Sequence, residues 1–194
     1  LAAPGHLAIN GVIPPAEYHE NVNNSIYTNV IAQISLQFAS QLHNDLSAIG
    51  GGSSVIDADD AQKYVQTASK LYMLYNSTGN YHPEFEGYDG SLIKQADVVL
   101  LGFPLEWDGF ADKDTRVNDL QYYEPRTDAV NGPAMTWGMF AIGWLENGRA
   151  DLAADLFKRS YLNIHGPYKV WTETPTGGAI NFITGAGGFL QAVM

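Results

Sequence analysis

The stretch at residues 14–29, PPAEYHENVNNSIYTN, decides how the rest of this chain is interpreted. It brings two carboxylates, Glu17 and Glu20, together with a histidine, a tyrosine and four amides in a segment that the double proline keeps from being helical. Hydrophobic residues then recur every four positions from Ile26, which predicts a long amphipathic helix capped by Ser25 or Asn24. Polar side chains are therefore expected on a rigid support, and the alternative is a solvated loop that only caps the helix.

Composition sets the outer limits. A chain of 194 residues that is 45% hydrophobic can bury one sizeable core, so we expect one globular unit. The formal net charge of −11 argues against nucleic acid and anionic membrane lipid as partners, because both are themselves negatively charged. There is no cysteine, which excludes disulfides and thiolate metal sites, and no apolar run approaches the ~20 residues of a membrane span.

The remaining periodicity predicts a helical protein. After the first helix, which the glycines at 50–52 should end, we expect helices at residues 57–75, 92–103, 112–123, 132–147 and 149–163 and from residue 185 onward, with residues 165–184 as a loop. The segment at 92–103 is apolar almost all round, so we expect a buried helix there, although periodicity alone also allows a buried strand.

Loops rich in polar and aromatic residues precede the helices that begin near residues 25, 92, 132 and 185, whereas the loops between them are plainer. Alternate loops of antiparallel helical hairpins lie at the same end, so these four loops should share one face. An all-α toroid with an inner ring of helices has this geometry. A solenoid would too, but the sequence has no repeat of fixed period, and an ordinary helical bundle is the plainest alternative.

Two carboxylates on separate loops are the minimum requirement for hydrolysis of a glycoside, one to protonate the leaving oxygen and one to activate water. We select Glu17 and Glu173, the latter in VWTETPTGG at residues 170–178. An inverting reaction needs the two carboxyl groups roughly 6.5–9.5 Å apart. Taken singly, either glutamate is more often a surface charge. The five histidines lack metal-ligand spacing, and no phosphate or dinucleotide motif is present, so we expect no cofactor.

Four blocks make the sequence similar to a known family: GVIPPAEYHENVNNSIYTN, HPEFEGYDGSLIKQADVVLLGFPL, YYEPRTDAVNGPAMTWGMF and VWTETPTGGAINFITGAGGFLQ, in that order. They resemble the second half of the catalytic domain of glycoside hydrolase family 65. Within the family the nearest branch is expected to be fungal acid trehalase, with the related animal glucosidase that trims glucosyl-galactosyl-hydroxylysine. The resemblance implies part of an (α/α)6 toroid, a barrel of six helical hairpins, with residues 1–194 as the C-terminal half of a single catalytic domain.

The resemblance also implies inversion at the anomeric carbon and assigns the two carboxylates. The first glutamate of the family's acid motif corresponds to Glu17, the general acid, with Glu20 as the fallback. The residue before it is usually Asp in the family and is Ala16 here, which puts the tuning of the acid in doubt. In the family's hydrolases a glutamate precedes the glycine-rich helix, and Glu173 corresponds to it as the general base.

Three further residues are expected at the sugar. Lys94 and Gln95 correspond to the pair that, by resemblance, hydrogen-bonds the glucose, although they would also serve to cap a buried helix. Trp171 is expected either in the wall of the sugar site or in the core. The expected reaction is hydrolysis of an α-glucoside, with α,α-trehalose first and kojibiose-type or glucosyl-galactosyl-hydroxylysine substrates as alternatives. A family phosphorylase and a non-catalytic sugar-binding or scaffold protein also stay open.

The expected partners, apart from the sugar, belong to the same enzyme. The chain begins at Leu1 without methionine and stops at Met194 in a predicted helix, so we expect a piece of a larger protein with an N-terminal β-sandwich and the first half of the toroid. A secreted or vacuolar location is expected. The sequon that begins at Asn76 is a candidate glycosylation site.

Overall fold

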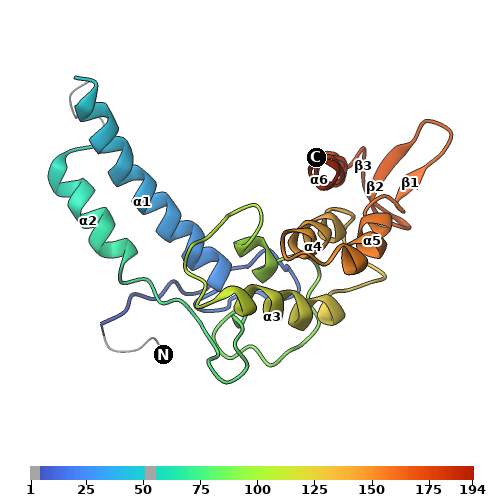
Figure 1. The fold of residues 1–194 in the computed structure, drawn as a ribbon, viewed down its shortest axis with the longest axis horizontal. Helices are drawn as coiled ribbons and strands as arrows, with labels where there is room; N and C mark the ends of the chain where they lie inside the picture. The colour runs from blue at the N-terminus through green and yellow to red at the C-terminus, as the bar shows by residue number, and fades with distance from the viewer. Residues whose placement is uncertain (1–4, 51–55) are drawn as a thin grey trace.

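The computed structural model describes residues 5–50 and 56–194, and shows a mostly helical chain with one small sheet (Figure 1). The helices are α1 Ile26–Ala48, α2 Ala58–Ala68, η1 Val98–Leu101, α3 Lys113–Tyr123, η2 Glu124–Arg126, α4 Met135–Glu146, α5 Ala150–Arg159 and α6 Ile183–Val193, of which η1 and η2 are 3₁₀ helices; the strands are β1 Ile164–His165, β2 Val170–Thr174 and β3 Gly177–Ile180. Helices α1 and α2 form a hairpin at one end, and α4, α5, α6 and the sheet lie at the other, with α3 and long loops between them.

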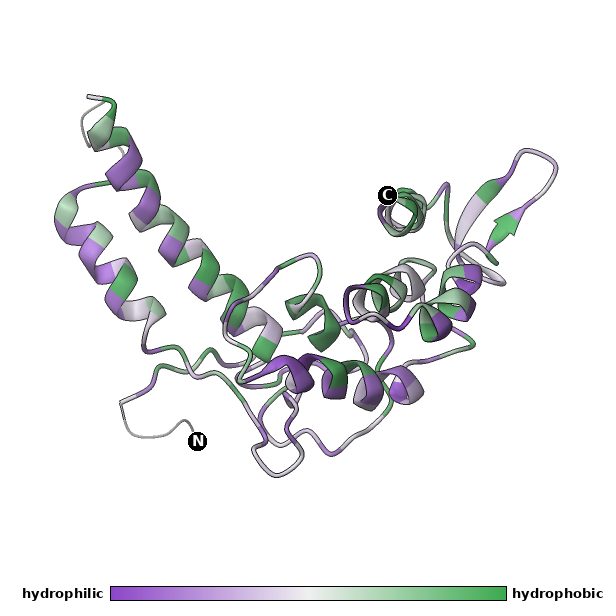
Figure 2. Ribbon diagram, viewed as in Figure 1, coloured by the Kyte–Doolittle hydropathy of each residue, from purple (hydrophilic) through white to green (hydrophobic). Residues whose placement is uncertain are grey.

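The first two helices begin where the sequence predicts. The Ser25 hydroxyl accepts the Thr28 N–H at 3.3 Å, and the Asp57 carboxylate caps α2 in the same way. Helix α1 ends at Ala48, and Gly50 follows in the left-handed region with φ 73°. The other two glycines of the predicted stop lie outside the described residues. Figure 2 shows hydrophobic and hydrophilic residues alternating along α1 and α2, as expected for helices with one packed face.

Helix α2 is shorter than predicted and ends at Ala68. Beyond it the chain pairs with the N-terminal segment instead of continuing the helix. The Leu7 N–H donates to the Lys70 carbonyl at 2.6 Å, and the Tyr72 N–H donates to the Leu7 carbonyl at 3.0 Å. These bonds use backbone groups that a longer helix would need for itself.

The helix predicted at residues 92–103 is wrong, because only Val98–Leu101 is helical, as a 3₁₀ turn. Its predicted burial is confirmed, since Ile93 is fully buried. The Ile93 N–H donates to the Arg126 carbonyl and the Asp128 N–H donates to the Ile93 carbonyl, both at 2.9 Å. A distant loop thus satisfies the backbone groups of this segment, and a helix is not required to bury it.

Helix α4 is the centre of the core at the C-terminal end. Every residue from Thr136 to Trp144 is buried, and the helix packs against both α5 and α6. Gly138 allows α6 to come close, because a Cβ at this position would lie 3.0 Å from the Gly188 carbonyl oxygen. The small residues predicted to let neighbours approach this helix therefore do so at Gly138.

The loop predicted at residues 165–184 is also wrong, because it holds most of a three-stranded antiparallel sheet in the order β1-β2-β3. The register pairs Ile164 with Trp171 and Thr174 with Gly177. These strands are too short to show a period of apolar and polar residues, and every residue of β2 is half-buried, so that neither of its faces is clearly the core face. The alternation from which a strand is usually predicted is therefore missing. Glu173 and Trp171 are consequently held on a strand and not on a free loop.

Candidate active site

The four polar loops contact one another in chain order, as predicted for loops that share one face. Three hydrogen bonds join successive loops: Gln95 Nε2 to the Pro15 carbonyl at 2.5 Å, the Asp128 N–H to the Ile93 carbonyl at 2.9 Å, and the Ala134 N–H to the Glu173 carbonyl at 2.8 Å. Segments from the two ends of the chain are thereby tied into one surface.

Glu17 lies at the exposed end of the first loop, with 55% of its side chain accessible. Lys94 Nζ lies 2.6 Å from Glu17 Oε2, and the lysine side chain itself is only 23% exposed. The structure therefore brings together two of the residues predicted for the site. In this arrangement Lys94 contacts the predicted acid, and Gln95 contacts the backbone of the same loop.

The Glu17 loop, which we define as residues 15–19, is held at every residue. Its contacts are Pro15 with Gln95, Ala16 with Asp97, Glu17 with Lys94, Tyr18 with Asp128 and His19 with Ser91, at donor–acceptor distances of 2.5, 2.9, 2.6, 2.8 and 3.0 Å. Three of the five partners come from the single segment at residues 94–97. The loop is thus attached to one short, buried piece of chain.

Two buried acids lie beneath this loop. Asp97 and Glu84 are both 0% exposed. Asp97 Oδ2 accepts the Ala16 N–H, while burial raises the pKa of Asp97. Burial, and then the neighbouring Asp97, raise the pKa of Glu84. His19 Nδ1 lies 3.3 Å from Glu84 Oε2 without forming a hydrogen bond, and burial lowers the pKa of His19.

The third loop supplies Asp128, an acid whose pKa is lowered instead of raised. Asp128 accepts the Tyr18 hydroxyl at 2.8 Å and the N–H groups of Val130 and Asn131 at 2.9 and 2.8 Å. Led by the Asn131 N–H, these bonds lower the pKa of Asp128 to about 2. The same contact raises the pKa of Tyr18. Asp128 is therefore an ionised anchor at neutral pH.

Sequence reasoning missed Asp97, Glu84 and Asp128. For Asp97 a signal was present, because it is the one charged residue in the apolar run at 96–105. A charge inside a buried segment is normally paired or functional. Glu84 stands in a loop with Glu86 and Asp89, and Asp128 in a loop with Glu124, so neither has a comparable signal.

Glu173 lies on β2, and its side chain is held within the sheet, where Oε2 accepts the Ala179 N–H at 3.0 Å. Its carbonyl accepts the Ala134 N–H just before α4, and Thr136 Oγ1 in the first turn of α4 accepts the Ala96 N–H at 3.3 Å. The start of α4 thus links the strand of the predicted base to the segment that holds the predicted acid.

The other two predicted residues have structural contacts. The half-buried Trp171 ring packs against Phe189 of α6 with centroids 5.4 Å apart, and it also lines a pocket of about 250 Å³ between β2 and the start of α6, so its expected place in the wall of the sugar site stays a prediction. Asn76 is half-buried in a turn in which its side-chain oxygen accepts the N–H groups of Thr78 and Gly79. Glycosylation of Asn76 and a secreted or vacuolar location stay predictions.

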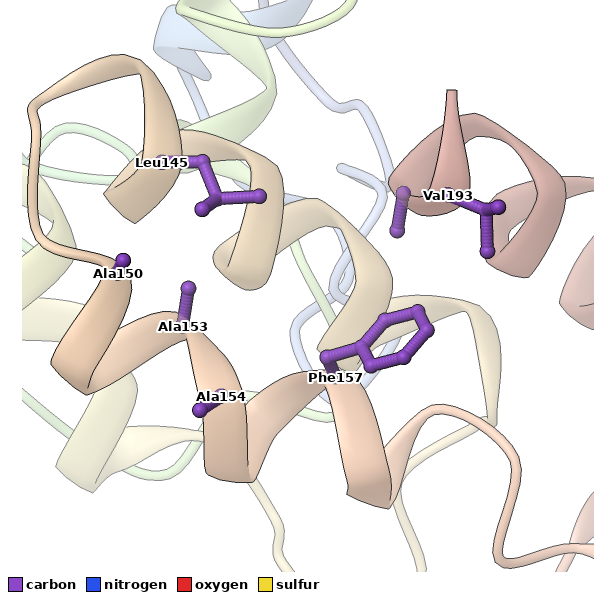
Figure 3. Close-up of a pocket in the computed structure, with 7 residues that line it drawn as sticks. Leu145, Ala150, Ala153, Ala154, Phe157 and Val193 are labelled. Carbon is purple, nitrogen blue, oxygen red and sulfur yellow. The ribbon is translucent and has the colours of Figure 1, made fainter.

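Two of the pockets near these elements border α4. One of about 340 Å³ lies between α4, α5 and α6, and the labelled side chains around it offer carbon alone (Figure 3). It has no group that would act on a glycosidic bond. A second, of about 230 Å³, adjoins the Glu17 loop and includes Pro15 and Gln95 together with Thr184 and Gln191. The second pocket is the one next to the predicted acid.

Across residues 5–50 and 56–194, no group of three or more histidine and carboxylate side chains is arranged to hold a metal ion. Within the same ranges, every helix is too short or too polar to span a bilayer.

Residues 2–91 match the model of the glycosyl hydrolase family 65 central catalytic domain. The resemblance to glycoside hydrolase family 65 is confirmed. A solved structure of a candidate kojibiose phosphorylase from the human microbiome aligns with a TM-score of 0.62 over 81% of this chain and 26% of that chain, at 18% identity. The fold class is therefore confirmed as well: the chain is part of an (α/α)6 toroid, with the small sheet as an addition to the predicted helices.

Two curated relatives bear on the branch of the family. The chain is 46% identical over 188 residues to protein-glucosylgalactosylhydroxylysine glucosidase of Danio rerio, covering 96% of the chain and 27% of that protein. It is 30% identical over 197 residues to the periplasmic acid trehalase of Saccharomyces cerevisiae, covering 93% of the chain and 15% of that protein. The expected order of the two branches is thus reversed. The chain spans about a quarter, or less, of the length of these two relatives.

Proposed function

We propose that this chain is the acid-and-base-bearing part of an inverting glycoside hydrolase that removes glucose from a glucosyl-galactosyl-hydroxylysine unit. The observation that carries the proposal is the attachment of Glu17, through Lys94 and its neighbours, to a surface that also includes the strand of Glu173. This gives two carboxylates on separate, braced segments, in a chain that resembles family 65.

In the proposed reaction, Glu17 is protonated on Oε1 while Oε2 accepts from Lys94, and it donates that proton to the oxygen that links glucose to galactose. Glu173 takes a proton from a water molecule, and that water attacks the anomeric carbon from the opposite face of the ring. The carbon–oxygen bond to galactose breaks as the bond to water forms. The reaction requires roughly 6.5–9.5 Å between the two carboxyl groups so that the water fits between them.

Lys94 and Gln95 have a double role in this proposal. Lys94 holds the carboxylate of Glu17, and Gln95 holds the Pro15 carbonyl beside the pocket of about 230 Å³. We assign the free hydrogen-bonding capacity of the two side chains to the hydroxyl groups of the glucose ring. Lysine has three donors and glutamine two donors and an acceptor, so each can contact sugar and protein together.

The substrate is proposed from the comparison of the two branches. Identity to the glucosidase is 46% and to the trehalase 30% over almost the same length. The pocket beside Gln95 is lined in part by loop residues, among them Pro15 and Pro104. Loops at a site commonly determine which substrate an enzyme prefers. We therefore place the collagen-type disaccharide unit first, kojibiose second as the smaller α-1,2-linked analogue, and trehalose third.

The test measures glucose release by the full-length protein from glucosyl-galactosyl-hydroxylysine, kojibiose and trehalose in parallel, with and without inorganic phosphate. We expect phosphate-independent release, fastest from the first. Replacing Glu17 by Gln should lower kcat by about 10²–10⁴-fold, the usual range for a general acid. Glu20→Gln distinguishes the two candidate acids: the exposed Glu20 directly follows the Glu17 loop, and its substitution leaves kcat unchanged if Glu17 is the acid and lowers kcat if the fallback, Glu20, has that role.

Other outcomes identify the competing functions. Fastest turnover of trehalose would identify the protein as a trehalase, as first expected from the sequence. Turnover that depends on phosphate would identify it as a phosphorylase. If Glu17→Gln leaves sugar binding and every other measured property intact and no substrate is hydrolysed, the protein is a non-catalytic sugar-binding or scaffold protein.

A further inference from the structure

The segment at residues 94–97 contacts the Glu17 loop in a way that fixes one peptide plane. Gln95 Nε2 donates to the Pro15 carbonyl at 2.5 Å, and the Ala16 N–H donates to Asp97 Oδ2 at 2.9 Å. The carbonyl of residue 15 and the N–H of residue 16 belong to the same peptide unit, which is planar. Both polar ends of that unit are therefore held, and the unit lies directly before the predicted acid.

Few degrees of freedom separate this plane from the carboxyl group of Glu17. Ala16 is 0% exposed, so its methyl group is locked into the core, and the far end of the Glu17 side chain is held by Lys94. The acid is thus fixed at its backbone by Asp97 and at its carboxylate by Lys94.

The burial of Asp97 and Glu84 is costly and is not explained by ordinary pairing. Among the described residues, Asp97 Oδ1 and both side-chain oxygens of Glu84 have no hydrogen-bond partner. No lysine or arginine of the described ranges forms an ion pair with either one. Buried carboxyl groups without such partners destabilise a fold, because the loss of water around them is not compensated. Such groups call for a role beyond packing.

We propose that Asp97 is a positioning residue for Glu17, which holds the Ala16 amide so that the predicted acid faces the glycosidic oxygen. This inference rests on the proposed function. Glu84 supports Asp97 as the partner that carries the proton, because two adjacent buried carboxyl groups do not both ionise. The Ala16 N–H favours the ionised form of Asp97, whereas Glu84 receives no such bond. Asp97 is therefore the one of the two that ionises more readily, and its ionised form strengthens the bond to the loop.

Asp119 provides a matched control. It is 1% exposed, and like Asp97 it accepts a backbone N–H, that of His82, at 2.8 Å. Its second oxygen contacts the His82 ring, and within the described part of the chain neither residue forms a hydrogen bond or an ion pair with the Glu17 loop. A substitution at Asp119 thus measures what the loss of a buried carboxylate does to the fold when the loop is untouched.

The experiment compares Asp97→Ala, Asp97→Asn and Asp119→Ala in the full-length protein, with kcat and KM measured per folded molecule. We expect Asp97→Ala to lower kcat by about 10²-fold, the scale of a misplaced reacting group, with KM nearly unchanged. Asp97→Asn should recover most of this loss, because the amide oxygen still accepts the Ala16 N–H. Asp119→Ala should lower the melting temperature and leave kcat per folded molecule unchanged.

A second readout does not depend on activity. Hydrogen exchange of a peptide that covers residues 14–20 should accelerate in Asp97→Ala and stay as in the unaltered protein in Asp119→Ala. Unchanged exchange in Asp97→Ala, or equal loss of kcat in the two alanine variants, overturns the positioning role. Absence of hydrolysis by the unaltered protein overturns the proposed function, and in that case the exchange of this peptide still decides whether Asp97 holds the loop.

Discussion

Glu84 is a residue whose environment should be visible in the pH dependence of stability. It is completely buried and faces Asp97, His19, Tyr88 and Tyr123. Burial raises its pKa in the folded protein above the ordinary 4.5. Between pH 4.5 and the folded-state pKa, the folded state therefore holds a proton that the unfolded state has released. Its contribution to stability is therefore greatest below pH 4.5 and is lost as the pH rises toward the folded-state pKa.

We expect Glu84→Gln to reduce this loss, since glutamine has the same shape and no proton to release. The free energy of unfolding should fall more steeply in the unaltered protein than in the variant between about pH 7 and 9, by up to about 1.4 kcal/mol per pH unit. This window lies above the lowered pKa of His19, so that ring stays neutral throughout. Urea unfolding at several pH values measures the slopes.

Glu20→Gln is the control for Glu84→Gln, because Glu20 is exposed and should leave the slope unchanged. Parallel curves for Glu84→Gln and the unaltered protein would show that Glu84 does not hold the proton of the buried pair.

At the scale of single residues, the sequence singled out Glu17 and two side chains that contact its loop, Lys94 and Gln95, but not the buried carboxyl pair. The role of Glu17 as the acid stays a prediction. Glu17, Lys94 and Gln95 stand in motifs that suggest a chemical role. In the structure Lys94 contacts Glu17, and Gln95 contacts Pro15 of the same loop. Asp97 and Glu84 act through burial and through contacts with residues about 60 to 80 positions away in the chain, at Ala16 and His19. No local rule reports contacts over such distances.

At the scale of elements, prediction succeeded where the local signals are complete. Helices α1, α2 and α3 begin at capping side chains, and the sequence shows each cap as Ser25, Asp57 or Asp112. It failed at residues 92–103 and 165–184, where backbone partners come from elsewhere in the chain or from strands too short to show a period. Hydrogen bonds to a distant loop decided the first segment, for which hydropathy predicted only burial, and the pairing of neighbouring short strands decided the second.

The contact between α4 and α6 leads to a prediction at this scale. A Cβ on Gly138 would lie 3.0 Å from a backbone oxygen of α6, so Gly138→Val should push the helices apart and cost about 1–3 kcal/mol, as overpacking of a core does. Gly187→Ala is the matched control, because nothing lies within 4 Å of a Cβ there. It should stabilise α6 by about 0.5–1 kcal/mol through helix propensity.

Thermal unfolding of the two glycine variants and the unaltered protein measures both effects. A Gly138→Val variant as stable as the unaltered protein would show that α6 moves away from α4 at no cost, which is incompatible with the packing described for this end of the molecule.

At the scale of the whole molecule, contacts link the two predicted catalytic carboxylates even though they lie near opposite ends of the chain. The loop of Glu17 is tied to residues 94–97, that segment to the first turn of α4, and the approach to α4 to the strand of Glu173. Each link is a backbone or buried hydrogen bond. The relative position of acid and base is therefore set by the core, and one stereochemical course of reaction is expected.

The anomer of the released glucose tests this arrangement. With an α-linked glucoside, attack of water opposite the leaving oxygen gives β-glucose first, which proton NMR distinguishes from α-glucose before mutarotation. Glu173→Gln should lower the rate by about 10²–10⁴-fold with or without phosphate, because the base that activates water is lost. Glutamine still offers an oxygen to the Ala179 N–H, so β2 and β3 should remain paired and the loss would not come from a disrupted sheet.

Release of α-glucose first would mean retention and would contradict a base that acts through water. Formation of a glucose phosphate, with Glu173→Gln fully active, would instead assign the attack to phosphate and remove Glu173 from the reaction.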